Sequence, residues 1–271
     1  MSAATSLRRV YAITLRQFYL MRSSPMRLLP LVAWVAIDIV LWGFIARYLN
    51  SLQKHGPDFV TTLLGAVLLW DFFARIMHGV TTAFLEDVWS RNFLNVFATP
   101  LTVSEYVAGL VVTGILTSLV GLVAMLLLAG GVFGLSFLAY GALFVPFVGV
   151  LLLFGIALGI FASALVLRFG PASEWLIWPI PALLSPFAAV FYPLSVLPEW
   201  MQWIGRALPP SYVFEGLRAL VAGQPVTLAW LGLGAALALV QVVLAWFCFE
   251  RVYRSAVRSG LLARYSAESA G

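Results

Sequence analysis

Long apolar stretches alternate with short polar connections along the chain. A helix that crosses a bilayer needs about 20 mainly apolar residues, and no charged side chain occurs between Tyr106 and Leu167. The pattern predicts one membrane-spanning helix for each apolar stretch. The six predicted spans are residues 28–46, 59–83, 106–132, 137–167, 175–197 and 226–249.

Two of these spans carry further backbone signals. Gly130, Gly131, Gly134 and Ser136 predict a tight hairpin between the third and fourth spans, because glycine permits the backbone conformations that a tight turn requires. The fourth span is long, and Pro146 lies within it. Because proline removes a helical hydrogen bond, we expect this span either to tilt or to break near Pro146.

The composition indicates a polytopic membrane protein. The chain has 271 residues, of which 62% are hydrophobic and 10% are charged, and its mean hydropathy is +1.00. Soluble domains usually carry about 25% charged residues. The single cysteine, Cys248, excludes an internal disulfide. The N-terminus does not resemble a signal peptide, because its first apolar run follows several arginines and lacks a small-residue cleavage site.

The connection between the second and third spans is polar and rich in side-chain chemistry, and it reads EDVWSRNFLNVFATPLTVSE. The pattern predicts a helix that ends before Pro100, since the residue before a proline avoids helical geometry. Thr102 and Glu105 predict a capping box that starts the third span. On the predicted helix, an apolar patch comes from Phe93, Leu94 and Phe97, and polar contacts come from Glu86, Asp87, Arg91 and Asn92.

Two interpretations of this connection stay open from the residues alone. In the first, it is a helix that docks a cytosolic partner. In the second, it is a solvated connector whose charges only keep it out of the bilayer.

Positive charge predicts the orientation, because arginine and lysine concentrate in cytoplasmic loops. One side carries both terminal flanks and the two even-numbered turns. We therefore expect a multi-pass protein of the cytoplasmic (inner) membrane, with both termini in the cytoplasm and the Glu86–Glu105 connection facing the cytosol. The arginines of the predicted cytoplasmic side are Arg8, Arg9, Arg16, Arg22, Arg27, Arg91, Arg168, Arg251, Arg254, Arg258 and Arg264.

Residues 7–22 predict an amphipathic helix ahead of the first span. Such a helix lies in the membrane interface. The alternative is a basic flank that sets the topology and has no partner. The basic and apolar residues fall on roughly opposite arcs, with Arg8, Arg9 and Arg16 on one and Val10, Ile13 and Met21 on the other.

After the fifth span, residues 198–223 predict two short helices. The Pro209-Pro210 pair ends the first helix, and Ser211 can cap a second helix that ends at Gly223. Each helix is too short to cross, so we expect both to dip into the outer face or to lie on it. The second helix carries a charged pair at helical spacing, Glu215 and Arg218.

Four ionisable residues fall inside predicted spans, where charge is costly and usually faces protein or water. Asp71, Arg75 and His78 lie on one face of the second span. Asp71 precedes Arg75 by four residues, which is the favourable order for a helical ion pair. Asp38 lies near the middle of the first span, and His78 is expected near the cytosolic interface. A proton relay fits this pattern, and a structural pair that locks helices together is the preferred interpretation.

No arrangement of residues points to catalysis. The sequence contains neither metal-ligand spacing nor a recognisable nucleophile and base. Lys54 is the only lysine, and it lies in QKHGP on the predicted outer side. A phosphate-binding GxxxxGKS or GxxxxGKT loop is therefore absent, and any nucleotide would have to bind to another subunit.

With these features in place, the chain resembles the membrane subunit, or permease, of type-2 ATP-binding-cassette (ABC) exporters. Three segments carry the resemblance: the basic helix before the first span, FLEDVWSRNFLNVFATPLTVSEYVAG, and FYPLSVLPEWMQWIGRALPPSYVFEGLRAL. The resemblance covers nearly the whole chain and depends on the order and spacing of these three segments. The resemblance implies an all-α integral membrane protein with six spanning helices, an N-terminal interface helix, a cytosolic coupling helix and outer re-entrant helices.

The resemblance also implies an organisation and partners. Residues 1–27 would form the interface helix region, and residues 28–271 a transmembrane domain with a coupling segment at 84–104 and re-entrant helices at 198–223. The chain would work as a homodimer or heterodimer with cytosolic ATPase subunits that bind ATP and Mg. It would contact membrane lipids but no nucleic acid, and it would hold no cofactor itself. Residues 167–174 would form a second, minor cytosolic contact.

Individual residues take expected roles from the resemblance. Glu86, Asp87, Arg91, Asn92, Phe93, Leu94, Phe97 and Pro100 would contact the ATPase. Arg8, Arg9 and Arg16 would belong to the interface helix, and Trp200, Trp203, Glu215 and Arg218 to the re-entrant region. Apart from the resemblance, the hypothesis of ATP-driven export gives Asp38 and the Asp71–Arg75 pair the role of holding the moving helices in register.

Two other functions compete with ATP-driven export. An ion-coupled secondary transporter would use Asp38, Asp71 and His78, and its transport would collapse with the proton gradient and persist without ATP. The paired broken helices common in that class are not recognisable. An intramembrane transferase or hydrolase would need a polar constellation at one interface, and the sequence shows none. The substrate stays open among lipid-linked glycans, amphipathic drugs and lipids.

Overall fold

The computed structural model describes residues 3–22, 25–52, 59–90, 95–96 and 98–260, and no strand occurs in these ranges. The predicted all-α class is therefore confirmed. The α-helices of at least four residues are α1 (Ala3–Arg22), α2 (Pro25–Leu52), α3 (Gly65–Trp89), α5 (Val103–Phe133), α6 (Phe144–Phe169), α7 (Glu174–Ile177), α8 (Ile180–Leu184), α9 (Glu199–Ala207), α10 (Pro209–Val221) and α11 (Leu228–Arg258).

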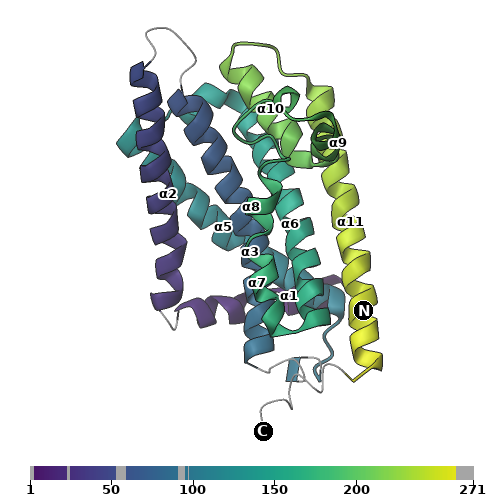
Figure 1. Cartoon of the computed structure of the whole chain (residues 1–271). Helices are drawn as coiled ribbons and strands as arrows, with labels where there is room; N and C mark the ends of the chain where they lie inside the picture. Colours follow the sequence, from purple (N-terminus) through teal and green to yellow (C-terminus); the bar gives the residue numbers. More distant parts are fainter. Residues whose placement is uncertain (1–2, 23–24, 53–58, 91–94, 97, 261–271) are drawn as a thin grey trace.

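The long helices run side by side between two ends of the molecule (Figure 1). α1 lies across one end, where α11 also finishes, and α9 and α10 lie at the other. We call these the α1 end and the α9–α10 end. On the predicted topology, the α1 end is cytosolic.

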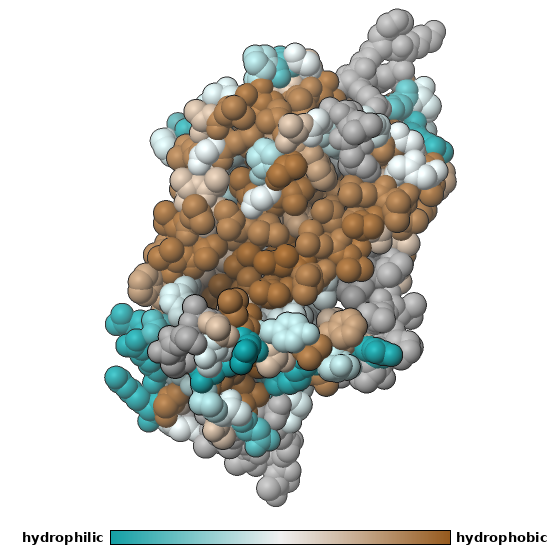
Figure 2. All heavy atoms as spheres, turned by 180° about the vertical axis from the view of Figure 1, so that it is seen from behind, coloured by the Kyte–Doolittle hydropathy of each residue, from teal (hydrophilic) through white to brown (hydrophobic). Residues whose placement is uncertain are grey.

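Four helical stretches of the described part are long and apolar enough to cross a membrane: Val60–Trp89, Val103–Phe133, Tyr140–Phe169 and Leu228–Arg258. The first joins the π-helix η1 (Val60–Leu64) to α3, and the third joins the end of the 3-10 helix η2 (Phe137–Leu143) to α6. α2 has 28 residues, which is also long enough for a crossing. Figure 2 shows an apolar band across the molecule with hydrophilic residues at both ends, as a bilayer requires.

The centre of the bundle is α3, which packs against both α5 and α6. Phe73 of α3 stacks on Phe154 of α6 with 5.0 Å between ring centroids, and both side chains are buried. Gly155 lets these helices approach closely, because a Cβ built there would lie 2.8 Å from the Cβ of Ile76. Small residues commonly permit such close contact between membrane helices.

The expected fifth span, residues 175–197, is not one continuous helix. It consists of α7 and α8, followed by turns and the short 3-10 helix η4 (Leu194–Val196). Prolines at positions 179, 181, 186 and 193 explain the breaks, because each lacks the N–H that a helix interior uses. The prediction of a regular helix here is wrong.

The hairpin between the third and fourth spans is confirmed, but the break in the fourth span lies elsewhere than predicted. Gly134 caps α5 with φ 72°, and its N–H donates to Gly130 O at 3.0 Å. The kink falls at Gly141, whose φ of 55° and ψ of −149° interrupt η2. Pro146 instead lies in the first turn of α6, where a missing N–H costs no helical hydrogen bond.

The two short helices predicted for residues 198–223 are present as α9 and α10. Pro209 is the first residue of α10, with Leu208 as its N-cap. Ser211 is therefore inside the helix, and the prediction that it caps α10 is wrong, because proline already suits the first helical position. Gly223 follows the end of α10 with φ 68°, which confirms the predicted stop.

The contact between α3 and α6 can be tested with paired glycine substitutions. Gly155→Ala should lower the thermal unfolding temperature in detergent, because its Cβ would meet Ile76 Cβ at 2.8 Å and the backbone oxygen of Phe73 at 3.0 Å. Overpacking of this kind costs about 1–3 kcal/mol. Gly149→Ala is the matched control on α6, since nothing lies within 4 Å of its Cβ. Equal unfolding temperatures, measured by tryptophan fluorescence, would contradict the packing.

Candidate functional site

The α1 end holds the polar network that lies next to the predicted coupling segment. Two arginines of α1 meet an aspartate at the end of α3 and a glutamate and a tyrosine at the start of α5. We call this set the α1 junction: Arg9, Arg16, Asp87, Glu105 and Tyr106.

Asp87 is the buried centre of the α1 junction, with 2% of its surface exposed. One guanidinium nitrogen of Arg16 lies 2.6 Å from both carboxylate oxygens, and the Tyr106 hydroxyl donates to Oδ2 at 2.7 Å. A buried carboxylate without partners costs several kcal/mol, so these contacts stabilise the ion and the placement of α1. The expectation that Asp87 contacts a cytosolic partner is wrong, because its side chain faces the protein interior.

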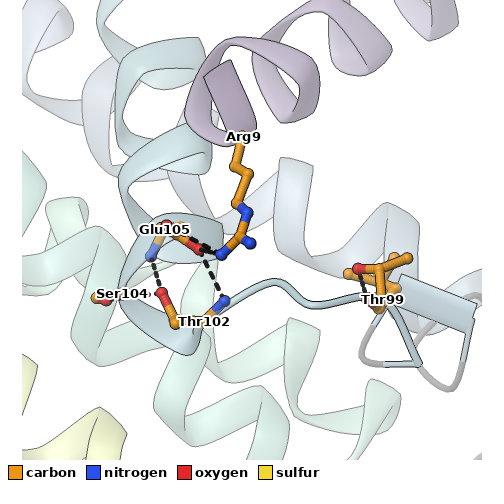
Figure 3. Close-up of polar contacts among 6 residues, drawn as sticks. Arg9, Thr99, Thr102, Ser104 and Glu105 are labelled. Carbon is orange, nitrogen blue, oxygen red and sulfur yellow. Dashed lines mark hydrogen bonds and ion pairs between the residues drawn. The ribbon is translucent and has the colours of Figure 1, made fainter. Parts of the chain in front are cut away.

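Glu105 has two roles at the start of α5. Its backbone N–H donates to Thr102 Oγ1 at 3.3 Å, and its Oε2 accepts from the Thr102 N–H at 2.9 Å, so the predicted capping box is confirmed. Arg9 reaches the same carboxylate from α1, with Nη1 3.2 Å from Oε2 (Figure 3). One side chain therefore caps α5 and joins it to α1.

α1 reaches both α3 and α5 because its contacts repeat at helical spacing. Arg9 and Arg16 are seven residues apart, which is about two turns and places them on one face. Ile13 lies between them and is buried against Gly109 of α5, where a Cβ would come 2.6 Å from Ile13 Cγ2. Gln17 extends this face by donating to a backbone carbonyl of α3 at 3.2 Å.

The predicted amphipathic helix is present as α1, but its faces are used differently from the expectation. The arc of Ile13 packs on the protein rather than entering the membrane interface. Arg8 is exposed, whereas Arg9 and Arg16 take part in the α1 junction. The outward surface instead carries large apolar side chains, including Tyr11 at 65% and Phe18 at 53% exposure.

The α1 junction brackets the connection between α3 and α5. Asp87 pairs just before this connection, Glu105 pairs just after it, and both partners belong to α1. The connection is therefore anchored at its two ends to one helix. A displacement of the connection would act on α1, α3 and α5 together.

The described part of this connection has helical backbone at residues 95–96, followed by a turn and bend at residues 98–100. Val96 is buried, and Thr99 bonds to its carbonyl through both N–H and Oγ1, at 3.3 and 2.6 Å. Pro100 is exposed. Glu86 belongs to the last turn of α3, so the predicted docking helix does not begin there as a separate element. Five predicted contact residues lie outside the described residues: Arg91, Asn92, Phe93, Leu94 and Phe97.

Sequence reasoning missed two residues of this region. Gln17 falls on the same helical arc as Val10 and Ile13. A polar residue within this apolar arc could have indicated that its side chain bonds to a neighbouring helix. Tyr106 directly follows the capping glutamate, and its bond to Asp87 joins residues 19 positions apart. No local pattern signals that contact.

The intramembrane polar residues are only partly brought together. Asp71 and Arg75 form the predicted pair, with 3.7 Å between Oδ2 and Nη2. Asp38 of α2 interacts electrostatically with the same arginine. His78 instead packs on Trp178, with 4.5 Å between ring centroids. Among the described residues, no group of three His, Cys, Asp or Glu side chains could hold a metal ion.

The predicted re-entrant residues lie at the α9–α10 end. Glu215 and Arg218 form the predicted pair at 2.9 Å, and Arg218 Nη1 also donates to Ala189 O at 2.8 Å. This arginine therefore joins α10 to the irregular chain after α8. Trp200 and Trp203 are 61% and 63% exposed, which suits aromatic residues at a membrane interface.

The turn between α6 and α7 lies at the α1 end. Arg168 is exposed there, with its guanidinium carbon 5.7 Å from the ring centroid of Phe169. Gly170 follows with φ 85°, a conformation that favours glycine. The contact of residues 167–174 with a cytosolic partner stays a prediction.

A comparison of the sequence with known protein families matches most of the chain to one family. The family model described as ABC-2 type transporter matches residues 8–221. The matched range contains the whole α1 junction, the connection between α3 and α5, and the helices α9 and α10. No curated protein matches the chain.

The burial of Asp87 predicts unequal effects of two arginine substitutions. Arg16→Ala removes the charge partner of the buried carboxylate, a change that costs about 3–5 kcal/mol in comparable buried pairs. Arg254→Ala is the matched control, because it breaks a pair on α11 whose arginine is 67% exposed, and such pairs contribute about 0.3–0.5 kcal/mol. Thermal unfolding in detergent measures both. Equal losses of stability are incompatible with a buried junction.

Proposed function

Because the chain belongs to the ABC-2 type transporter family and is a transmembrane subunit of an ABC transporter, we propose that it exports a substrate as one half of a dimeric permease driven by a separate cytosolic ATPase. ATP and Mg bind to that ATPase. The substrate passes between the two permease subunits. The sequence supports a separate ATPase, since its one lysine, Lys54, does not belong to a phosphate-binding loop.

The single observation that carries this proposal is the anchoring of the connection between α3 and α5. Arg16 binds Asp87 at one end of it, and Arg9 binds Glu105 at the other. An ATPase that contacts the connection would push on an anchored element rather than on a slack loop. Because α1, α3 and α5 are joined by these ion pairs and by direct helix packing, the push would reach all three helices.

The intramembrane cluster supports a second part of the same proposal. Arg75 pairs with Asp71 on its own helix and lies within electrostatic range of Asp38 on α2. Charges at this depth are stable only when paired or facing water. The cluster therefore keeps α2 in register with α3 while the α1 end moves.

Docking of the ATPase is tested by charge reversal in the connection. Arg91→Glu should reduce co-purification of a cassette ATPase with the tagged chain and lower the ATP hydrolysis that the permease stimulates, while membrane insertion survives. The physical reason is loss of a cation from the expected contact surface. Arg258→Glu, on the exposed end of α11, is the control at the same end of the molecule. Unchanged binding and hydrolysis in Arg91→Glu would overturn the docking role.

The same complex separates ATP-driven export from ion coupling. Transport into sealed vesicles should stop when ATP is withheld and survive collapse of the proton gradient. The reverse result would instead favour the ion-coupled mechanism through Asp38, Asp71 and His78.

Mechanical coupling through the α1 junction is tested by removing one hydroxyl. Tyr106→Phe should leave ATPase binding intact but lower permease-stimulated hydrolysis severalfold, because Asp87 loses a charge-assisted hydrogen bond, which is worth about 1.5–3 kcal/mol. Tyr192→Phe is the matched control, since its hydroxyl donates to Pro186 O at 2.8 Å at the other end of the molecule. Identical stimulation by Tyr106→Phe and wild type would argue against coupling through the junction.

A further inference from the structure

A cavity of about 430 Å³ lies at the α9–α10 end, between α9, α10, η4 and the start of α11. Pockets that bind small molecules or cofactors have volumes of roughly 300–1,000 Å³. The cavity has polar side chains, among them Gln202, Arg206 and Glu215, and an aromatic wall formed by Tyr212 and Trp230. It therefore suits a ligand with a polar and an apolar part.

Arg206 gives the cavity a positive charge that no carboxylate among the described residues neutralises. Its Nη2 donates to Gln202 Oε1 at 3.4 Å, and its guanidinium carbon lies 5.1 Å from the ring centroid of Trp203. These contacts orient the guanidinium and leave most of its five N–H donors open. A planar set of donors with a full positive charge matches a phosphate group.

Glu215 gives the same cavity a hydrogen-bond acceptor. Its Oε1 accepts from the Leu194 N–H at 2.6 Å and from Arg218 at 2.9 Å. No donor in the described part of the chain bonds to Oε2, and 40% of the side chain is exposed. A ligand that carries an O–H or N–H group can donate to this oxygen. Because Arg218 balances the charge of Glu215, the cavity as a whole stays positive.

Trp230 connects the cavity to the outer surface of α11. Its ring lies 5.9 Å from the ring of Tyr212, and 58% of its surface is exposed. Spacings of three, four and seven residues place the next exposed apolar side chains on one face of the helix. This stripe runs from Trp230 toward the α1 end through Leu233, Val240, Leu244 and Phe247, which are 50%, 54%, 60% and 61% exposed.

We propose that this cavity binds the head group of a phospholipid. The phosphodiester pairs with Arg206, a head-group O–H or N–H donates to Glu215, and an acyl chain follows the α11 stripe from Trp230. The occupant is a membrane lipid rather than a soluble phosphate, because the aromatic wall leads directly onto the apolar stripe. Tryptophan also favours the head-group level of a bilayer. The site does not depend on ATP-driven export.

Native mass spectrometry of the purified protein, with one lipid added at a time, measures this binding. Wild type should retain phosphatidylglycerol and phosphatidylethanolamine severalfold better than phosphatidylcholine, whose quaternary ammonium has no donor for Glu215. Diacylglycerol, which has no phosphate, should bind weakly. Glycerol phosphate should not displace the lipid at equal concentration. Equal retention of phosphatidylcholine, or displacement by glycerol phosphate, would overturn the proposed occupant.

Substitutions of Arg206 test the phosphate contact itself. Arg206→Ala should weaken retention of phosphatidylglycerol about tenfold, the effect expected for a charge-assisted hydrogen bond, and Arg206→Lys should restore part of it. Arg168→Ala is the matched control, because it is also an exposed arginine beside an aromatic ring but belongs to the last turn of α6 rather than to α9. Unfolding temperatures without lipid verify that each variant folds. Equal retention by Arg206→Ala and wild type, or an equal loss in Arg168→Ala, would refute the site.

Discussion

The buried carboxylate of Asp87 is the constraint on which the α1 end depends. With 2% of the residue exposed, its charge must be matched inside the protein. Arg16 supplies the opposite charge and Tyr106 supplies a further donor, so α1 has to cross α3 and α5 at the level of that carboxylate. Helical geometry then brings Arg9 to Glu105, two turns away. Two ion pairs thus determine where a whole helix lies and which helices it joins.

The features that could be predicted from the sequence are those set by neighbours three or four residues apart. The Thr102–Glu105 capping box, the Asp71–Arg75 pair and the Glu215–Arg218 pair are all of this kind. The two ion pairs of the α1 junction instead join residues 96 and 71 positions apart. No local spacing signals such contacts. For the same reason a charge pattern could suggest that Asp87 was exposed, when α3 in fact continues to Trp89 and turns this side chain inward.

The incorrect predictions of helix boundaries come from proline and glycine, whose effects depend on position within an element. The fourth span was expected either to tilt or to break near Pro146, but Pro146 lies in the first turn of α6, where its missing N–H costs nothing. Gly141, which carries no side-chain signal, makes the kink instead. Pro209 takes the first position of α10 and leaves Ser211 inside it. The prediction of an all-α membrane protein was still correct, because it depends on hydrophobicity summed over whole spans and not on single helix boundaries.

The two ends of the molecule therefore differ in chemistry, with a closed ionic junction at the α1 end and an open cavity with polar and aromatic walls at the other. The central claim is that α1, the connection after α3 and the start of α5 move as one body. Electron spin resonance distances between labels on Ala12 and Ala98, both exposed, test it in the ATPase complex, with Cys248 replaced by serine and labelled chains diluted in unlabelled ones. We expect one narrow distance distribution that ATP does not shift and that broadens in the Arg9→Ala, Arg16→Ala double variant. A distance that shifts with ATP, or an unchanged distribution in the double variant, would contradict the claim.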